Sequence, residues 1–380
     1  MEYKKLKIAT VVGTRPEIIR LSSTIKRIDE YLEQIIIHTG QNYDYELNEI
    51  FFKDLGLRKP NYFLEVNTSS LGQVLGETLI KSEEVFKKEK PDAILILGDT
   101  NASIVGIIAK RMRIPIFHME AGNRSFDMNV PEEINRRIID HVADFNLVYT
   151  EHARRHLLSE GLSHRRIYLT GSPMFEVLKE NEEKINNSEI LKELQLIEKQ
   201  YFIVSTHREE NVDNKNHLKQ ILSVLNTLAK SYDMPIIVST HPRTRKRLEA
   251  LTNIDIDKRI QFLKPFGFFD YIKLQKESLC AISDSGTISE ESAMLSFPAI
   301  SLRQSMERPE AQDSGTIILT GFNSDVILNA IDTVVNEQQI LGNYKETPHE
   351  YQILNTSWRV LKLIMGNAKL SNKWWGINND

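Results

Sequence analysis

The sequence predicts an α/β protein with two Rossmann-like, doubly wound domains that face each other across a cleft. Three observations support this prediction. The chain has 380 residues and 41% of them are hydrophobic, which is enough for two separate cores. Short apolar runs alternate with amphipathic helical patterns, as in parallel sheets whose strands are joined by helices. Several of these runs end in small or charged residues, at the sheet edge where open α/β folds bind ligands.

The first half of the chain contains six strand-then-helix units. Apolar runs predict strands at 7–12, 35–38, 93–97, 114–119, 146–150 and 167–170. Helical patterns lie at 45–55 and 71–89, and a further helix is expected to start at Pro131, since proline is favoured at the first helical position. We assign residues 1–180 to an N-terminal Rossmann-like domain.

The second half repeats the architecture without repeating the sequence. Strands are expected at 201–206, 235–240, 260–263, 279–283 and 299–302. The polar, charged segment 181–200 is expected to cross between the domains. We assign residues 181–365 to a C-terminal Rossmann-like domain, with a final helix over 351–366 that can return to the first domain, and 366–380 to a C-terminal tail.

Charge and cysteine content exclude several classes of protein. The 48 basic and 52 acidic residues give a net charge of -4, which argues against a nucleic-acid-binding protein with a broad basic surface. The only cysteine, Cys280, lies in an apolar run, so disulfide scaffolds and cysteine-rich zinc sites are excluded. No signal-peptide pattern or apolar run of roughly 18 residues is present, so we expect a cytoplasmic protein without membrane insertion.

Three carboxylates in the first half are candidates for acid/base chemistry. Asp99 and Glu120 each follow a predicted buried strand, and the carboxyl ends of parallel strands meet at one edge of a sheet. Glu132 lies in the first turn of the helix that starts at Pro131, four residues before Arg136, so the two side chains share a helix face. An ordinary surface ion pair is the alternative, but the position just after a strand-end carboxylate favours a functional site.

The turn after the first strand, Gly13-Thr-Arg-Pro-Glu, is expected to face the same edge. Pro16 can occupy the first helical position, and Arg15 and Arg20 bring positive charge. The turn has the geometry of a phosphate-facing turn, but it matches neither the G-x-G-x-x-G fingerprint nor the P-loop. NAD and ATP are therefore disfavoured as bound cofactors.

In the second half, the strongest signal is Asp284-Ser-Gly-Thr, which lies between a predicted strand and a predicted helix. Ser285, Gly286 and Thr287 would bring unpaired backbone N–H groups and the positive end of the helix dipole to a phosphate. Ordinary capping of the helix by Ser285 or Thr287 is the alternative.

Further charged residues surround this turn. His207 follows the first strand of the second half, where a structural histidine is the alternative. One of Glu290 and Glu291 could reach a ribose hydroxyl pair, and Arg308 adds a guanidinium fork that suits phosphate. The implied ligand is a diphosphate, whose sugar end would lie among the three carboxylates of the first half.

Seven motifs occur in order along nearly the whole chain: Gly13-Thr-Arg-Pro-Glu, Gly98-Asp-Thr, His118-Met-Glu-Ala-Gly, Pro131-Glu-Glu-Ile-Asn-Arg, Thr206-His-Arg-Glu-Glu-Asn, Asp284-Ser-Gly-Thr and Glu307-Arg-Pro-Glu. As an ordered set they resemble the non-hydrolysing UDP-N-acetylglucosamine 2-epimerase family. The resemblance implies a glycosyltransferase B type fold, a homodimer, and no metal or nicotinamide. It also implies removal of the C2 proton with anti elimination of UDP, followed by re-addition of UDP and protonation of the other face of C2.

The resemblance also implies roles for individual residues. By motif position, Asp99, Glu120 and Glu132 match acid/base carboxylates, and His207 matches a catalytic histidine near the glycosidic oxygen. Arg15, Ser285, Gly286 and Arg308 match diphosphate contacts, Glu291 a ribose contact, and Arg136 the partner of the helix glutamate. The family commonly has lysine where this chain has Arg20, so the charge is kept.

Departures from the family pattern narrow the expected substrate. Asn123-Arg-Ser-Phe-Asp and Gly286-Thr-Ile-Ser resemble the capsule and O-antigen branch, which converts UDP-2-acetamido-2,6-dideoxy-L-talose to UDP-N-acetyl-L-fucosamine. Conversion of UDP-N-acetylglucosamine to UDP-N-acetylmannosamine is the alternative. Phe126 is expected near the 6-deoxy end of the sugar. Gln41-Asn-Tyr-Asp-Tyr replaces the Gln-His segment of a known activator site, which argues against regulation by a second nucleotide sugar.

Three other functions stay open at this point. A glycosyltransferase of the same fold would share the nucleotide site but would need no carboxylate cluster at C2. A non-catalytic nucleotide-sugar sensor would show no turnover. A hydrolysing epimerase would release free sugar and UDP.

Overall fold

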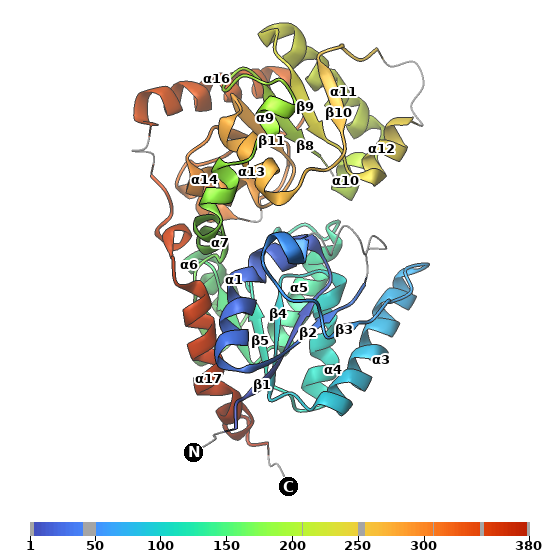
Figure 1. Cartoon of the computed structure of the whole chain (residues 1–380), viewed down its shortest axis with the longest axis vertical. Coiled ribbons are helices and arrows are strands. Elements are labelled where there is room, and N and C mark those ends of the chain that lie inside the picture. Colours follow the sequence, from blue (N-terminus) through green and yellow to red (C-terminus); the bar gives the residue numbers. More distant parts are fainter. Residues whose placement is uncertain are drawn as a thin grey trace. The chain divides into compact units, whose positions relative to one another are not determined.

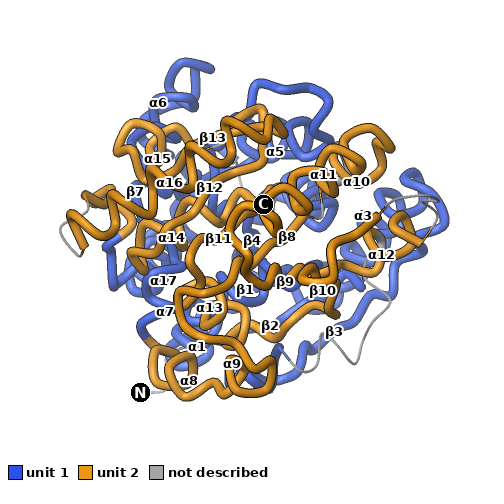
Figure 2. The backbone as a smooth tube through the Cα atoms, turned by 90° about the horizontal axis from the view of Figure 1, so that it is seen from above, with its two compact units in different colours: residues 1–179, 352–380 blue, residues 180–351 orange. Residues whose placement is uncertain are grey.

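The computed structural model describes residues 4–40, 51–206, 208–249, 255–306, 308–342 and 346–377, and the chain forms two compact units. Unit 1 comprises residues 1–179 and 352–380, and unit 2 comprises residues 180–351 (Figure 2). The expected second domain (181–365) and separate tail (366–380) therefore need correction, because the chain from residue 352 onward belongs to unit 1.

Within the described residues, unit 1 is built on a parallel sheet of seven strands. The strands are β1 (Lys7–Val12), β2 (Glu33–His38), β3 (Tyr62–Phe63), β4 (Ala93–Leu97), β5 (Ile116–Met119), β6 (Phe145–Val148) and β7 (Ile167–Leu169). Their order across the sheet is β3-β2-β1-β4-β5-β6-β7, and neighbouring strands are parallel. The strands β4, β5 and β6 are buried at every residue, which explains why their sequences are almost wholly apolar.

Helices cover both faces of this sheet (Figure 1). They are α1 (Arg15–Tyr31), α3 (Leu71–Glu89), α4 (Val105–Arg111), α5 (Pro131–Val142), α6 (Glu151–Ser159), α7 (Met174–Glu180) and α17 (Thr356–Trp374), with short 3-10 helices at Asn101–Ile104 and His164–Arg166. One core lies between the sheet and the helices α3, α4 and α5, where Phe86, Val105 and Ile139 pack against Ile94 and Ile116. Pro131 occupies the first position of α5, as predicted, whereas α1 begins at Arg15, one residue before Pro16.

The last helix, α17, belongs to unit 1 because it packs along α1 (Figure 1). The guanidinium of Arg27 on α1 lies 4.1 Å from the centroid of the Trp358 ring. At the start of α17, the backbone N–H and the hydroxyl of Ser357 donate to the buried carboxylate of Glu176, at 2.8 and 2.6 Å. These contacts hold the first turn of α17 against unit 1, and the helix continues to Trp374, beyond the end expected at residue 366.

An aromatic and ionic cluster fixes the end of α17. Trp375 Nε1 donates to the buried carboxylate of Asp144 at 2.5 Å, and the guanidinium of Arg166 lies 4.0 Å from its ring centroid. We expect Trp375→Ala to lower the free energy of unfolding of unit 1 by about 1–3 kcal/mol, because Asp144 loses a donor and Arg166 loses its aromatic partner. Thermal melting checks this prediction.

The control is Leu370→Ala, at an exposed position of α17, which should change the free energy of unfolding by less than about 0.5 kcal/mol. Equal losses of stability in the two variants would contradict the role of the cluster.

Within the described residues, unit 2 has a parallel sheet of six strands, in the order β10-β9-β8-β11-β12-β13. The strands are β8 (Phe202–Ser205), β9 (Ile236–Ser239), β10 (Ile260–Leu263), β11 (Cys280–Ser283), β12 (Ala299–Ser301) and β13 (Ile318–Leu319). The helices are α8 (Glu182–Asn186), α9 (Ile190–Glu193), α10 (Glu209–Val212), α11 (Lys215–Tyr232), α12 (Pro242–Glu249), α13 (Phe268–Glu277), α14 (Ile288–Leu295), α15 (Pro309–Asp313) and α16 (Ser324–Leu341).

Alternate residues of the unit 2 strands enter two different cores. Phe202 and Val204 pack with α11 and α16 on one face of the sheet, together with the buried Cys280. Ile203 packs on the other face, with residues of α13 and α14. This alternation is the two-residue period of a β-strand. The helices α8 and α9 pack against α13, so the segment expected to cross between domains is part of unit 2.

Strand order identifies a switch point in each sheet. In unit 1, the chain runs outward from β1 through β2 and β3, and then returns to the other side of β1 with β4. In unit 2, the corresponding reversal lies between β8 and β11. Ligands of open α/β sheets bind outside the carboxyl ends of the strands at such points. In the described parts of the chain, no helix has the length and apolar character needed to cross a membrane.

Candidate active site

In unit 1, Asp99 and Glu120 lie at the carboxyl ends of the neighbouring strands β4 and β5. The Gly98 N–H donates to the carbonyl of Met119 at 3.0 Å, which ties the two strand ends together. The Glu120 carboxylate lies beside Gly98: a side-chain Cβ added to this glycine would be 3.6 Å from Glu120 Oε2. The structure therefore places Asp99 and Glu120, which the sequence singled out, at neighbouring strand ends.

Each of these carboxylates is held by a buried arginine. Arg136 on α5 donates to Asp99 Oδ2 through Nε at 2.8 Å and Nη2 at 2.5 Å. Arg20 on α1 donates to Glu120 Oε2 at 2.8 Å, and Asn123 Nδ2 lies 3.3 Å from Oε1 of the same residue. Both arginines are less than 5% exposed. Charge-assisted hydrogen bonds of this kind fix the direction of each carboxylate.

The helix α5 contributes two glutamates with different surroundings. Glu132, the candidate acid/base residue, is half-buried in the first turn. Glu133 is fully buried, accepts hydrogen bonds from the backbone N–H and hydroxyl of Ser125, and pairs with Arg136 and Arg137. Sequence analysis paired Arg136 with Glu132, and the structure adds Asp99 and Glu133 as its partners. Glu133 therefore anchors the loop before α5.

Glu17 connects the turn after β1 to the end of β4. Its buried carboxylate accepts hydrogen bonds from Gly13 N and Thr14 N, and from the hydroxyl of Thr100 at 2.5 Å, next to Asp99. Burial raises the pKa of Glu17 to about 7, and the nearby charge of Asp99 adds to this rise. Sequence analysis missed this residue. The Thr-x-x-Glu spacing of a capping box, Thr14 to Glu17, could have identified it.

The raised pKa of Glu17 predicts a pH-dependent stability. Because the buried carboxyl group of Glu17 favours its neutral form, it stabilises the folded protein at low pH. This stabilisation is fully present below the ordinary glutamate pKa of 4.5 and is lost as the pH rises through about 7. In the wild type, we expect the free energy of unfolding to fall by up to about 3 kcal/mol over this pH range because of Glu17. In Glu17→Gln this fall should be absent. Denaturant unfolding at several pH values checks this. Glu30→Gln, at an exposed position of the same helix, should keep the pH dependence, and an unchanged pH dependence in Glu17→Gln would contradict the assignment.

In unit 2, the turn between β11 and α14 is organised by short hydroxyl contacts. Thr287 is the N-cap residue of α14, but its side chain makes no capping hydrogen bond. Instead, Ser285 Oγ accepts from Thr287 N at 3.3 Å and lies 3.0 Å from Thr287 Oγ1. Capping by Thr287 therefore does not order this turn. Ser285 and Gly286 lie directly before the first turn of an eight-residue helix, where backbone N–H groups can bind an anion.

Arg308 adds a positive charge to this turn. Its side chain is 4% exposed, its Nε donates to the carbonyl of Gly286 at 3.2 Å, and its guanidinium pairs with the fully buried Glu290 on α14. Glu291, the predicted ribose contact, is also buried and accepts from Gln275 Nε2 at 2.8 Å. The two acids of the first turn of α14 thus have separate partners.

Asp284 joins the two strand ends at the switch point of unit 2. It is fully buried and accepts from Arg208 N at 3.1 Å and from Asn211 Nδ2 at 2.9 Å. Arg208 follows β8 and Asp284 follows β11, so one carboxylate holds the loops that leave these neighbouring strands. The adjacent His207 and the segment 41–45 lie outside the described residues, so their expected roles stay predictions.

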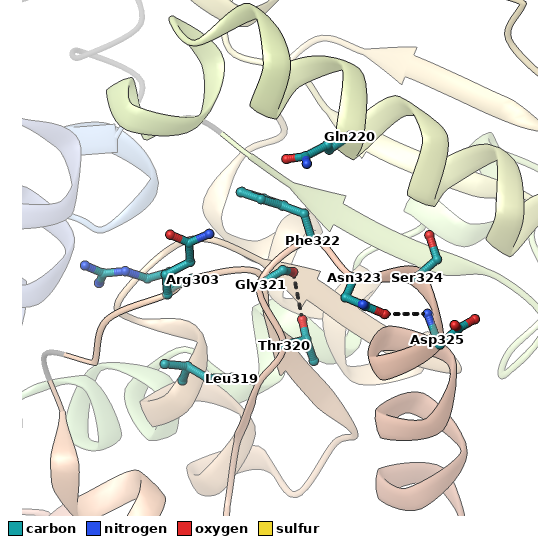
Figure 3. A pocket seen from close by; sticks show the side chains of 10 residues that line it. Gln220, Arg303, Leu319, Thr320, Gly321, Phe322, Asn323, Ser324 and Asp325 are labelled. Atoms are coloured by element: carbon teal, nitrogen blue, oxygen red, sulfur yellow. Dashed lines mark hydrogen bonds between the residues drawn. The ribbon is translucent and has the colours of Figure 1, made fainter.

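A hollow of about 780 Å³ opens at the carboxyl ends of β12 and β13 (Figure 3). Gln220 from α11, Arg303 and Gln304 from the loop after β12, and residues 319–325 line it. Arg303 also borders a narrow gap with Ser285, Gly286 and Arg308, so the hollow adjoins the turn between β11 and α14. Sequence analysis missed Arg303, although its position two residues after β12 follows the same strand-end rule.

Arg15 and Arg20 complete the predicted residues of unit 1. Arg15 starts α1 and its guanidinium lies 5.6 Å from the centroid of the Phe51 ring, whereas Arg20 is committed to Glu120. Among the residues that the structure describes, no group of three or more His, Cys, Asp and Glu side chains could hold a metal ion.

Two parallel-sheet α/β units, each with its polar residues at the carboxyl edge, define a protein with the glycosyltransferase B type fold. The crystal structure of the glycotransferase of kitacinnamycin shares this fold, with a TM-score of 0.61 and 8% identity over 96% of this chain and 99% of that one. At this identity the likeness concerns the fold alone.

The sequence model described as UDP-N-acetylglucosamine 2-epimerase matches residues 26–365. UDP-N-acetylglucosamine 2-epimerase from Rickettsia bellii has a TM-score of 0.91 and 46% identity, covering 98% of this chain and 100% of that chain. The structure of Methanocaldococcus jannaschii UDP-GlcNAc 2-epimerase in complex with UDP-GlcNAc and UDP has a TM-score of 0.87 and 33% identity, covering 95% of this chain and 100% of that chain. The curated UDP-2,3-diacetamido-2,3-dideoxy-D-glucuronate 2-epimerase of Pseudomonas aeruginosa is 34% identical, covering 86% of this chain and 92% of that protein.

The chain belongs to the UDP-N-acetylglucosamine 2-epimerase family and is a carbohydrate epimerase, an isomerase. The fold and family predicted from the sequence are therefore confirmed. The names of its relatives contain different sugars, so membership of the family does not identify the sugar on which this chain acts. The predicted substrate branch stays a prediction.

Proposed function

We propose that the protein is a non-hydrolysing 2-epimerase of a UDP-2-acetamido sugar. The observation that carries the proposal is the placement of Asp99 and Glu120 at neighbouring strand ends of unit 1, with each carboxylate held by a buried arginine. Inversion of one carbon requires a proton acceptor and a proton donor on opposite faces, so more than one acid/base group must be present. Glu132, half-buried in the first turn of α5, is the third candidate.

The proposed reaction has two matched halves. A carboxylate removes the C2 proton, the C–H electron pair forms the C1–C2 double bond, and the C1–oxygen pair leaves with UDP. The UDP oxygen then adds back to C1 of the glycal while a second group delivers a proton to the other face of C2. Because this C2 proton is only weakly acidic, departure of UDP needs assistance from cations and hydrogen-bond donors. By motif position, His207 acts near the glycosidic oxygen.

Unit 2 is proposed to bind the UDP part of the substrate. Ser285, Gly286 and Thr287, which precede α14, and the guanidinium of Arg308 are proposed to contact the diphosphate. The N–H groups of Ser285 and Thr287 donate to Ser283 Oγ and Ser285 Oγ, so these two residues are proposed to act through their hydroxyls. By the family resemblance, Arg15 is a further proposed diphosphate contact. Glu291 is proposed to bind the ribose. The M. jannaschii relative was crystallised with UDP-GlcNAc and UDP, which supports a UDP-sugar as the ligand.

Two sugars are the leading substrates. UDP-2-acetamido-2,6-dideoxy-L-talose, giving UDP-N-acetyl-L-fucosamine for capsule or O-antigen synthesis, is favoured by the segment 123–127. UDP-N-acetylglucosamine is favoured by the names of the R. bellii and M. jannaschii relatives. Phe126 is 67% exposed, so its ring is accessible to a ligand. Its backbone is in the left-handed region, with φ +55°. If Phe126 contacts the 6-deoxy end, Phe126→Gly should change the preference between the two substrates. An unchanged preference would contradict this placement.

We also propose a cytoplasmic homodimer, following the family resemblance. Analytical ultracentrifugation at micromolar concentration would give twice the mass of 43.9 kDa. A monomer at this concentration would contradict the proposal.

Product analysis tests the proposed function. Incubation with each of the two nucleotide sugars, followed by NMR of the sugar ring, should show a C2 epimer still attached to UDP. Free sugar and UDP would indicate a hydrolysing epimerase, transfer only when an acceptor is added would indicate a glycosyltransferase, and binding without any product would indicate a sensor.

A further inference from the structure

The buried side chain of His118 connects the two strand ends that carry Asp99 and Glu120. It lies on β5, two residues before Glu120, and is fully buried. Its Nε2 is 2.9 Å from the carbonyl oxygen of Gly98, the residue before Asp99. Its Nδ1 is 2.9 Å from Asp140 Oδ1 on α5. Nε2 therefore bonds to the backbone that leads into Asp99, whereas Nδ1 lies close to the Asp140 carboxylate without an aligned hydrogen bond.

Asp140 holds the chain on both sides of Glu120. While Oδ1 meets His118, Oδ2 accepts from Gly122 N at 3.1 Å and from Arg124 Nη1 at 2.6 Å. His118 and Gly122 are the residues two before and two after Glu120. Asp140 is fully buried and Arg124 is 1% exposed, so these contacts are shielded from water.

The backbone between these anchors has an unusual conformation. Glu120 has φ +65°, in the left-handed region that residues other than glycine seldom adopt. Gly122 has φ +82°, and a Cβ there would lie 2.3 Å from the carbonyl oxygen of Ala153, so no larger residue fits. Such a conformation persists only where surrounding contacts hold it.

An ordinary buried ion pair in the core is the alternative explanation for His118 and Asp140. Two observations favour a functional role. The contacts of the pair go to Gly98 and Gly122, which flank the proposed acid/base residues, and not to a remote part of the core. The directions of the Asp99 and Glu120 side chains are set separately, by Arg136 and Arg20. The histidine and aspartate act instead on the backbone beneath these side chains, in addition to the hydrogen bond from Gly98 N to the carbonyl of Met119.

We propose that His118 and Asp140 are positioning residues that fix the spacing of the Asp99 and Glu120 carboxylates for proton transfer at C2. This inference rests on the proposed function. Neither residue is proposed to touch the substrate. A displacement of about 1 Å in a reacting group can lower a rate by about 10²-fold, whereas substrate binding through unit 2 would be unaffected. Loss of the pair should therefore lower kcat and leave KM and the affinity for UDP unchanged.

Three substitutions of His118 separate positioning from stability. In His118→Gln, the amide nitrogen can replace Nε2 and donate to Gly98 O. In His118→Asn, the amide can replace only Nδ1 toward Asp140, and His118→Leu keeps neither contact. With the nucleotide sugar that the wild type epimerises, we expect kcat to fall by about 10²-fold in His118→Leu and to be restored to within about 10-fold of wild type in His118→Gln. His118→Asn should lie between them. KM and the Kd for UDP should stay within about two-fold in all three.

Gln34→Leu is the matched stability control. Gln34 is 7% exposed near the amino end of β2, and its amide bonds to Thr10 and to the carbonyl of Ile25. This variant should lower the melting temperature without lowering kcat. If His118→Leu keeps kcat within about three-fold of wild type, or if all three His118 variants lose kcat only in step with melting temperature, the positioning role is overturned while the proposed function stands. A wild-type chain that epimerises neither nucleotide sugar overturns both.

Discussion

Glu120→Gln is expected to lower kcat for C2 epimerisation by about 10²–10⁴-fold, the range associated with loss of a general acid or base. The amide has nearly the same shape as the carboxylate but cannot accept the C2 proton. KM should change little, because the proposed UDP contacts belong mainly to unit 2 and to Arg15. The measurement is the initial rate of epimer formation by NMR at saturating substrate.

The matched control is Glu30→Gln. Glu30 and Glu120 are each paired with an arginine of α1 at 2.8 Å, Arg27 and Arg20 respectively, but the Glu30 pair is solvent-exposed. Glu30→Gln should leave kcat within about two-fold of wild type, since exposed ion pairs contribute little. Comparable kcat for the two variants would mean that Glu120 takes no part in proton transfer.

Arg308→Gln is expected to have a double effect, because Arg308 neutralises a buried acid and is proposed to bind phosphate. Removing one partner of a buried ion pair typically destabilises a protein by about 3–5 kcal/mol, and here the fully buried Glu290 would lose the guanidinium of Arg308. Loss of a charge-assisted hydrogen bond to the diphosphate should also weaken UDP binding by about 10–100-fold. Thermal melting and calorimetric titration with UDP measure the two effects separately.

A double variant separates these contributions. Glu290→Gln combined with Arg308→Gln removes both charges, so most of the lost stability should return. The affinity for UDP should not return, because no guanidinium is present to bind the diphosphate. Recovery of UDP affinity together with stability would show that Arg308 acts only as the partner of Glu290.

Sequence patterns predicted the sheets well because most strands are buried on both faces and therefore apolar. The two-residue strands β3 and β13 escaped prediction, since so short a pair leaves no periodic pattern. The return of the final helix to the first domain was expected, but its packing partner there was out of reach. An amphipathic pattern shows that a helix has a face to bury, but it does not reveal that the partner is α1, more than 300 residues earlier in the chain.

The candidate site was predictable to the extent that local rules apply. Asp99 and Glu120 were identified because ligands of open α/β sheets bind at the carboxyl ends of the strands. Arg136 was identified by its helical spacing from Glu132, as the partner of an acidic side chain. The partners themselves could not be predicted, because Arg136 meets Asp99 across 37 positions and Arg20 meets Glu120 across 100. Distant pairs of this kind are set by tertiary packing, as is the burial that raises the pKa of Glu17.

The most direct test of the central claim is the fate of the C2 hydrogen during turnover in D₂O. If carboxylates of unit 1 exchange this proton while UDP leaves and returns, the recovered nucleotide sugar should carry deuterium at C2 in both epimers, and Glu120→Gln should slow this incorporation in step with kcat. Turnover that yields an epimer retaining its original C2 hydrogen would contradict the account.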